Sequence, residues 1–273
     1  MVEGPTEEAV EQQSRDLQAR IEKAARAIVD ARVVIGFTGA GISTESGIPD
    51  FRTMGEFWEG FDPATFEVEI DNREAFEKHP ERVWAFFSQA IRVMEKAQPN
   101  EGHKALARLG RLGRMAAIIT QNVEGLHQKA GSENVIEFHG NIFRLHCMRC
   151  EAKKHWEEVR DGPIPPRCGC GYVLKPEVPL FGDEVNVEAF AASSVLAMNA
   201  HILLVAGSHG AIAPVNRIPV LAKEYGALLV EVNREKSLYT DRYTDVFLQG
   251  RTGEILPLLA REVGALLGVA VGP

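Results

Sequence analysis

The chain has 273 residues, and a hydrophobic content of 45% is enough for a folded protein with a sizeable core. Its formal net charge of −8, without any long run of Lys and Arg, argues against a dedicated nucleic-acid surface, because phosphate neutralisation needs clustered cations. No apolar stretch approaches the about 20 residues that cross a bilayer, and residues 1–18 are too acidic for a signal peptide, so we expect a cytoplasmic protein without a membrane partner.

The first predicted element is a helix over residues 7–30. Thr6 can cap it, and Glu7 and Glu8 suit the positive end of the helix dipole. Apolar residues recur on one stripe at helical spacing: Val10, Leu17, Ile21, Ala24 and Ile28. We expect this stripe to pack on a sheet, and the rival interpretation is a helix that binds a partner.

A glycine turn follows the next element, an apolar strand over residues 33–37. Gly39 and Gly41 lack a Cβ, so the backbone can turn tightly and approach phosphate oxygens, with amides at the following helix start as donors. The dinucleotide fingerprint needs Gly or Ala at position 44, where this chain has Thr44. Gly47-Ile48-Pro49 then cuts any helix short, so we expect a shaped loop after Ser43. A simple strand exit explains the turn equally well when it is taken alone.

Apolar runs typical of strands alternate with helical patterns along the rest of the chain. They cover residues 33–37, 115–120, 201–206, 227–232 and 245–248. This alternation predicts an α/β fold with a doubly wound, mostly parallel, Rossmann-like sheet. In such sheets ligands bind beyond the carboxyl ends of the strands. The glycine turn, Thr120-Gln121-Asn122 and Gly207-Ser208-His209 should therefore converge on one crevice.

Two stretches interrupt the alternation, a helical region rich in Phe and Trp and a cysteine-containing segment. We expect residues 1–52, 99–140 and 179–273 to form the Rossmann-like domain. Residues 53–98 would be a helical insertion and residues 141–178 a metal-binding module, which together form a smaller domain.

Polar residues at one strand exit suggest a site for a sugar or a carboxamide. The segment from Thr120 to His127 offers neutral amides and the carboxylate of Glu124, which can bond hydroxyl groups. A strand end followed by a helix cap would explain Asn122 or Glu124 individually. His139, in Glu137-Phe138-His139-Gly140, is a candidate base for activating a ribose hydroxyl, although a single histidine is more often structural.

All four cysteines lie in one short segment, as Cys147, Cys150, Cys168 and Cys170. In a reducing compartment this clustering favours metal ligation over disulfides. Two such hairpins can bring four thiolates together around zinc and stabilise a small ribbon. Four sulfur ligands leave no open position for water, so we expect one structural zinc ion and no catalytic metal.

Several motifs then occur in a fixed order along residues 20 to 260: Gly39-Ala40-Gly41-Ile42-Ser43, Gly47-Ile48-Pro49-Asp50-Phe51-Arg52, Gln121-Asn122, His139-Gly140, the four cysteines, Lys175-Pro176-Glu177-Val178, Phe181-Gly182-Asp183-Glu184 and Asn233. In this order they resemble the sirtuin (Sir2) family of NAD-dependent protein deacylases. The resemblance implies a Rossmann-like domain and a small zinc-and-helix domain, with NAD between them as a consumed co-substrate. The acyl oxygen of a modified lysine would attack C1′ of the nicotinamide ribose as nicotinamide leaves. His139 would be the general base and Asn122 a second catalytic residue.

The resemblance also assigns the binding residues. Contacts with NAD are implied for Gly39, Ala40, Gly41, Ile42, Ser43, Asp50, Phe51, Arg52, Gln121, Asn122, Glu124, Gly207, Ser208, His209, Asn233 and Thr252. Within this set, Ala40, Phe51 and Arg52 would line the reactive end of NAD and Gln121 and Asn122 its ribose. Gly207 and Ser208 would lie on the phosphate and adenine side, and Asn233 at the adenosine ribose. Phe181, Gly182, Asp183 and Glu184 would form an edge that pairs with an extended acyl-lysine peptide.

The chain departs from the family pattern at three places. Glu124 stands where the family usually has Asp, and Gly207-Ser208-His209, followed by Gly210, replaces the usual Gly-Thr-Ser and an apolar residue. Members that remove acidic acyl groups have Tyr and Arg at the positions of Phe87 and Ala90. Without a guanidinium to pair a distal carboxylate, we expect weak succinyl or malonyl removal and a preference for apolar acyl groups, acetyl first.

Three other functions compete with deacylation. Glu124 and the altered loop at His209-Gly210 motivate a protein mono-ADP-ribosyltransferase as the main alternative. A non-enzymatic NAD sensor or scaffold is the next alternative. It would survive only if His139→Ala changed no turnover. An NAD dehydrogenase is disfavoured because the loop from Ser43 to Arg52 crowds the position where a hydride donor would meet its substrate. The sequence does not fix the oligomeric state.

Overall fold

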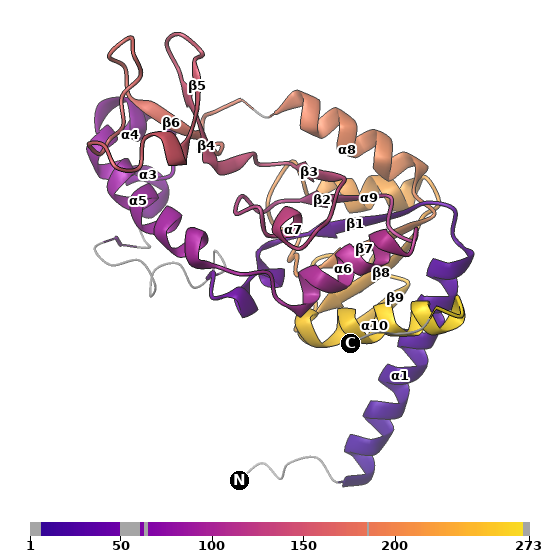
Figure 1. Ribbon diagram of the computed structural model, residues 1–273. Helices are drawn as coiled ribbons and strands as arrows, with labels where there is room; N and C mark the ends of the chain where they lie inside the picture. Colours follow the sequence, from indigo (N-terminus) through magenta and orange to yellow (C-terminus); the bar gives the residue numbers. More distant parts are fainter. Residues whose placement is uncertain (1–6, 50–60, 63–64, 185, 270–273) are drawn as a thin grey trace.

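The computed structural model describes residues 7–49, 61–62, 65–184 and 186–269 (Figure 1). Six parallel strands form the main sheet in the order β3-β2-β1-β7-β8-β9. They are β1 (Val34–Thr38), β2 (Ala117–Thr120), β3 (Val135–Glu137), β7 (Ile202–Ala206), β8 (Leu228–Asn233) and β9 (Val246–Gln249). From β1 the chain adds β2 and β3 on one side, and it then returns to add β7, β8 and β9 on the other side. The order of addition therefore reverses between β1 and β7, which is the doubly wound order of Rossmann folds. Ligands bind at such a reversal, beyond the carboxyl ends of the two strands.

The prediction of a doubly wound sheet is confirmed, and the sheet has one strand more than the predicted set. The additional strand, β3, is short and pairs through Val135 with Ile118 of β2. Its three residues are all partly exposed, so it lacks the continuous apolar run that marked the buried strands.

Helices cover both faces of this sheet (Figure 1). α1 (Glu7–Asp30), α6 (Glu101–Arg111) and α10 (Thr252–Leu266) pack on one face, and α8 (Val187–Asn199) and α9 (Arg217–Glu224) pack on the other. Successive residues of a strand point to opposite faces of the sheet. Val34 therefore packs in the core beneath α1, α6 and α10, and Ile35 packs in the core beneath α8 and α9. A further short helix, α7 (Leu126–Lys129), follows the end of β2.

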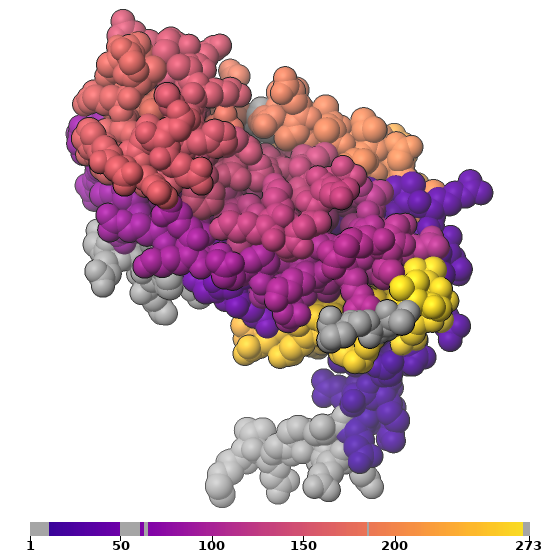
Figure 2. Space-filling model, in the orientation of Figure 1, coloured from indigo at the N-terminus to yellow at the C-terminus, as the bar shows by residue number. Residues whose placement is uncertain are grey.

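The predicted helix over residues 7–30 is present and does pack on the sheet. Ile21, Ala24 and Ile28 are buried and Leu17 is partly buried against the same core. Residues 11–16 are exposed, and Figure 2 shows this part of α1 projecting from the body. The predicted cap, Thr6, lies outside the described residues. None of the helices within the described ranges is long and apolar enough to span a bilayer.

A smaller lobe has a separate hydrophobic core of its own. Its helices are α3 (Phe66–Glu69), α4 (Arg73–Lys78) and α5 (Pro80–Lys96), and its antiparallel strands are β4 (Asn141–Cys147), β5 (Lys153–His155) and β6 (Leu174–Glu177). Trp84 of α5 donates from Nε1 to the carbonyl of Leu174 at 2.8 Å and stacks on Trp156 with ring centroids 6.1 Å apart. The helical stretch and the cysteine stretch, far apart in sequence, therefore share one core.

Candidate active site

The glycine turn after β1 lies directly against the exit of β7. It forms two short 3-10 turns, η1 (Ala40–Ile42) and η2 (Thr44–Ser46), in place of a helix. The amide of Gly41 donates to the carbonyl of Gly207 at 2.9 Å. A Cβ on Gly41 would come within 2.8 Å of that carbonyl oxygen, and one on Gly207, at φ +64°, would come within 2.3 Å of the Ile42 nitrogen. Glycine is needed here because two backbone turns touch at the switch point of the sheet.

The sequence suggested that these glycines allow phosphate oxygens to approach the backbone. In the structure they allow the backbone after β7 to approach. The amides of Gly39, Gly41 and Ile42 donate to the carbonyls of Ala206, Gly207 and Gly39. These three donors are therefore already bonded within the protein. The turn is held in shape by its own backbone bonds, and Ile42 places its side chain in the core of the sheet.

Gln121 and Asn122, which follow β2, bridge the two glycine exits. Gln121 donates from Nε2 to Ser208 Oγ at 2.8 Å. Asn122 donates from Nδ2 to the Gly39 carbonyl at 3.2 Å and to Ser43 Oγ at 3.1 Å. The structure thus brings the three predicted strand exits together at the same end of the sheet.

Glu124 is fully buried beneath this edge. Its Oε1 accepts from Ser43 Oγ at 2.6 Å and from Asn122 Nδ2 at 3.2 Å. Burial raises the pKa of Glu124, and the hydrogen bonds from Ser43 and Asn122 oppose that rise. The longer side chain, one methylene more than Asp, reaches Ser43 and closes a ring of polar contacts with Asn122.

Two histidines extend this ring, and local sequence patterns give little sign of them. His103 and His127 are fully buried with ring centroids 4.9 Å apart. His103 Nε2 lies 3.4 Å from Ser43 Oγ, and His127 Nε2 lies 2.9 Å from Thr38 Oγ1. Burial lowers the pKa of His103 to about 4, and burial together with the His103 charge lowers that of His127 to about 3. Both rings are therefore neutral at physiological pH.

Asn100 is a further residue that the sequence interpretation missed. It caps α6 by accepting from the Gly102 amide, and it donates from Nδ2 to the Ile42 carbonyl at 2.7 Å. One side chain thereby fixes both a helix start and the turn after β1. An Asn directly before an acidic helix start is a recognisable cap, but its second role depends on tertiary packing.

His139 has the geometry of a neutral base. Its Nδ1 lies 2.9 Å from the carbonyl oxygen of Gln121, which can only accept, so Nδ1 carries the proton and Nε2 keeps a lone pair. Burial lowers the pKa of His139, and the bond to the Gln121 carbonyl opposes the shift. Gly140 follows at φ +73°, where a Cβ would lie 1.7 Å from the Glu177 carbonyl oxygen. The imidazole is thus placed where the sheet passes into the smaller lobe.

Arg144 links the end of the main sheet to the strands of the smaller lobe. Arg144 of β4 donates to Glu137 Oε2 at 2.6 Å and to Glu177 Oε2 at 2.7 Å. Glu137 ends β3, two residues before His139, and Glu177 ends β6. Desolvation opposes ionisation of Arg144, but its bonds to the two carboxylates raise its pKa overall.

The remaining residues assigned to the cofactor take different positions. Ser208 and Asn233 are buried and bonded, with Asn233 Nδ2 donating to the Ser208 carbonyl at 3.0 Å and to Glu231 Oε1 at 2.8 Å. His209 is exposed. Thr252 is buried at the start of α10, where its Oγ1 lies 3.5 Å from Glu45 Oε2. Asp50, Phe51 and Arg52 lie outside the described residues.

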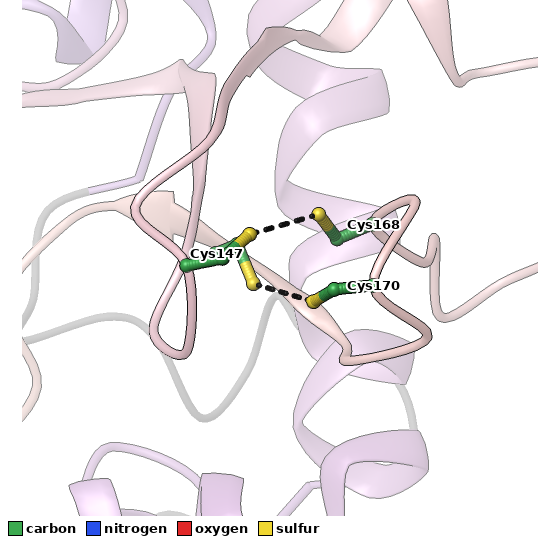
Figure 3. A group of neighbouring side chains, drawn as sticks. Cys147, Cys168 and Cys170 are labelled. Carbon is green, nitrogen blue, oxygen red and sulfur yellow. Dashed lines mark hydrogen bonds between the residues drawn. The ribbon is translucent and has the colours of Figure 1, made fainter.

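The four cysteines form a candidate metal site in the smaller lobe. Cys147 and Cys150 face Cys168 and Cys170, and Figure 3 shows the sulfur atoms of the two hairpins pointing toward one another. All four Sγ atoms lie within 4.8 Å of one another, with 3.5 Å between Cys147 and Cys170. Zinc bound by four thiolates at about 2.3 Å places its sulfurs about 3.8 Å apart, so the donor set and its spacing fit zinc. Four sulfur ligands would leave no position for water, as in structural zinc sites.

The segment predicted to bind a substrate backbone is already paired on one side. The amide of Phe181 donates to the Asp71 carbonyl at 3.0 Å, and its carbonyl accepts from the Arg73 amide at 2.9 Å. Its ring remains 56% exposed. Gly182 and Glu184 are exposed, whereas Asp183 turns its carboxylate inward. A peptide would therefore meet the Phe181 ring and the backbone beyond it.

Comparison with known proteins is consistent with this geometry. The model of the Sir2 family matches residues 39–214. An NAD-dependent protein deacylase of Thermococcus kodakarensis is 42% identical over 248 residues, which cover 88% of this chain and 94% of that protein.

Two solved structures extend the likeness to the fold. A Sir2 homologue in complex with NAD aligns with a TM-score of 0.84 at 35% identity, covering 90% of this chain and 94% of that one. Sir2Af2 bound to a myristoylated histone peptide aligns with a TM-score of 0.75 at 32% identity, covering 92% and 99%. With a family match over more than half of its length and a relative this similar, the chain belongs to the Sir2 family.

Proposed function

We propose that this protein is an NAD-dependent protein lysine deacylase that moves an acyl group from lysine to ADP-ribose and releases nicotinamide. The observation that carries the proposal is His139, whose protonated Nδ1 is bonded to the Gln121 carbonyl and whose Nε2 is left as a base. A neutral imidazole next to the segment Gln121–Asn122, which we assign to the ribose, suits activation of a sugar hydroxyl. The NAD-dependent deacylase of Thermococcus kodakarensis and the NAD complex of a Sir2 homologue support the assignment.

The residues at the sheet edge would divide the work. NAD would supply an electrophilic ribose carbon and nicotinamide as the leaving group. Gln121 and Asn122 would bond the ribose, Ser208 and Asn233 would lie at the adenosine half, and the polar ring around Glu124 would hold Asn122 in place. His139 would accept a proton from a ribose hydroxyl at Nε2. The zinc held by the four cysteines would stabilise the smaller lobe without entering the chemistry.

We infer that the preferred acyl groups are apolar, with acetyl first. Phe87 and Ala90 are buried in the core of the smaller lobe, where Phe87 packs on Trp84 and Phe86. Neither side chain can pair with a distal carboxylate, so succinyl or malonyl groups would be poorly bound. The myristoylated histone peptide bound by Sir2Af2 supports an apolar acyl class for a related protein.

The wider setting is also part of the proposal. We infer that residues 1–52, 99–140 and 179–273 form the NAD-binding domain and that residues 53–98 and 141–178 form the small domain. A cytoplasmic location, and a protein or peptide as the partner rather than nucleic acid, rest on composition.

A peptide panel tests the function. One lysine peptide bearing acetyl, butyryl, succinyl or a long-chain acyl group is incubated with zinc-replete protein and NAD and followed by mass spectrometry. We expect one nicotinamide released for each acyl group lost, with acetyl and butyryl faster than succinyl. An ADP-ribosyl label left covalently on protein would favour the mono-ADP-ribosyltransferase instead. If no peptide led to nicotinamide release, the proposed function would be wrong.

A further inference from the structure

A buried cluster of charges lies behind the segment Phe181–Glu184. The Lys175 side chain, from β6, is only 3% exposed, and its Nζ lies 2.8 Å from Asp183 Oδ2. The same Nζ donates to the Val178 carbonyl at 2.6 Å, and Asp183 Oδ2 also accepts from the Leu180 amide at 2.9 Å. One ammonium and one carboxylate thus join three points of the loop that leads into Phe181.

The helical side of the smaller lobe holds the same segment from the opposite direction. Asp71 and Arg73 occupy both backbone hydrogen-bonding groups of Phe181, and Asn72 forms a parallel bridge with it. Asp71 also interacts electrostatically with Lys175 and Asp183. The loop is therefore clamped between backbone bonds on one side and buried charges on the other.

Such a cluster is a poor source of stability. Removing an ammonium and a carboxylate from water costs more than their attraction returns unless every partner is well placed. Burial lowers the pKa of Lys175, and the pairing with Asp183 opposes this. A buried pair in a loop that faces a substrate is better explained by the shape that it imposes.

We propose that Lys175 is a positioning residue: by joining Val178, Leu180 and Asp183 it holds Phe181–Glu184 in the shape that binds the acyl-lysine peptide. The inference rests on the proposed function, because it assigns the substrate edge of that same site. Lys175 bonds to Val178 and pairs with Asp183, both outside the turn after β1 and the exits of β2 and β7, so we expect its effect to fall on the peptide and not on NAD.

The cluster also gives peptide binding a dependence on pH. Burial raises the pKa of Asp71 to about 7, with Glu67 and Asp183 raising it further and Lys175 lowering it. The charged and titratable groups around the cluster are Glu67 of α3, Arg73 and Glu77 of α4, His146 of β4, Lys175 of β6, and Asp183 and Glu184 of the loop. Below pH 7 a protonated Asp71 leaves Lys175 and Asp183 as a balanced pair. Above it, Asp71 adds a second negative charge to the cluster, and we expect the loop to loosen.

The first test separates peptide from NAD. K175M/D183N removes the two paired charges together, so that the Asp183 carboxylate is not left without its ammonium, and the carboxamide oxygen introduced at position 183 still accepts from the Leu180 amide. We expect KM for an acetyl peptide to rise about tenfold while KM for NAD changes less than about twofold. K223M is the matched control, since it breaks the half-exposed pair between Lys223 and Asp245 away from the site. An unchanged peptide KM, or a parallel rise in both KM values, would overturn the inference.

The second test uses a variant that leaves Lys175 intact. In D71N the side chain cannot ionise, so the rise of peptide KM in the wild type between about pH 6 and about pH 8 should disappear. The KM for NAD should follow the same pH profile in both proteins. Identical peptide profiles for D71N and wild type would contradict the role of the cluster. Wild-type turnover is measured first, because its absence would reject the proposed function itself and the inference with it.

Discussion

The two edges of the site are built by different means. The edge that we assign to the cofactor consists of Gly39–Gly47, Gln121–Glu124, Gly207–Ser208 and Asn233. It is held mainly by backbone contacts and uncharged amides, with Glu124 as its one buried carboxylate among these residues. The substrate edge, made of Asp71–Arg73 and Lys175–Glu184, is held by buried charges. Amide and backbone contacts do not titrate, whereas a cluster of several charged side chains responds to protonation.

This difference makes the cofactor edge less sensitive to pH near neutrality than the substrate edge. The histidines beneath the cofactor edge have pKa values of about 4 and about 3, so they do not titrate near neutrality. Asp71 on the substrate edge, with a pKa of about 7, does. In the proposed function, NAD would be bound by a fixed frame, while peptides of varied sequence would meet a loop whose shape depends on pH.

Replacing His139, which we propose as the base, should have the largest effect. We expect His139→Ala to lower kcat by about 10² to 10⁴ and to leave the fold intact, since the imidazole makes one backbone hydrogen bond. Because burial keeps the pKa of His139 below its usual value, wild-type kcat/KM should level off before neutral pH as pH rises. Nicotinamide release measures both. The exposed His201, at the other end of β7, provides the control variant His201→Ala. Retention of more than a tenth of the activity in His139→Ala would exclude the role of base.

Loss of the metal should affect the substrate side before the sheet. Cys168→Ser removes one of four thiolates, so we expect zinc loss and a melting temperature lower by about 10 °C. Activity should fall with it, because β4 and β6 lead from the cysteines to Arg144 and Glu177 beside His139. Calorimetry with a zinc assay measures both. A zinc-free variant with unchanged melting and turnover would show that the four cysteines are not a structural metal site.

A paired glycine substitution tests the backbone contact of the cofactor edge. Gly207→Ala places a Cβ at φ +64° against the Ile42 nitrogen, and we expect it to lower the free energy of unfolding by about 3 kcal/mol. Gly226→Ala is the control, because Gly226 has φ +92° with open space around its Cβ. It should cost about 1 kcal/mol. Urea unfolding of both variants gives the comparison, and equal losses would mean that the contact between the turns is unimportant.

Much of this architecture could be predicted from local sequence patterns. Buried strands with continuous apolar runs gave the doubly wound sheet, and the polar exits at Gly39, Gln121 and Gly207 do lie together. The cysteine spacing gave the metal site because its geometry depends on two tight hairpins alone. Where residues close in sequence decide the structure, the pattern was sufficient.

The features of the site that local patterns did not predict depend on contacts between segments far apart in the sequence. His103 lies on a helix whose amphipathic pattern carries no sign of Ser43, and only packing of α6 brings them together. The glycines after β1 suggested phosphate contacts, but their tight fit against Gly207 becomes evident only once β1 and β7 are neighbours. Asp71 and Lys175 belong to two separate insertions that share a core, so no local motif could have joined them.

The smallest effect concerns the stability of the substrate edge. The pKa of Asp71 is raised on folding, so between about pH 4 and about pH 7 the folded state holds a proton that the unfolded state has lost. Stability from this group is therefore greatest at low pH and falls as pH rises through about 7. Asp71→Asn removes that loss. We expect its free energy of unfolding, relative to wild type, to be about 2 kcal/mol more favourable at about pH 8.5 than at about pH 5.5.

Urea unfolding at the two pH values measures this difference, with Asp241→Asn as a control on an exposed ion pair with Lys236. The control should show the same difference from wild type at both pH values. If Asp71→Asn behaved like the control, the carboxylate would not be buried near Asp183 and Glu67. The contrast between the substrate edge and a cofactor edge whose histidines stay neutral would then disappear. A difference confined to Asp71→Asn would instead place the pH response of the site in the loop that carries Phe181, apart from His139 and the sheet.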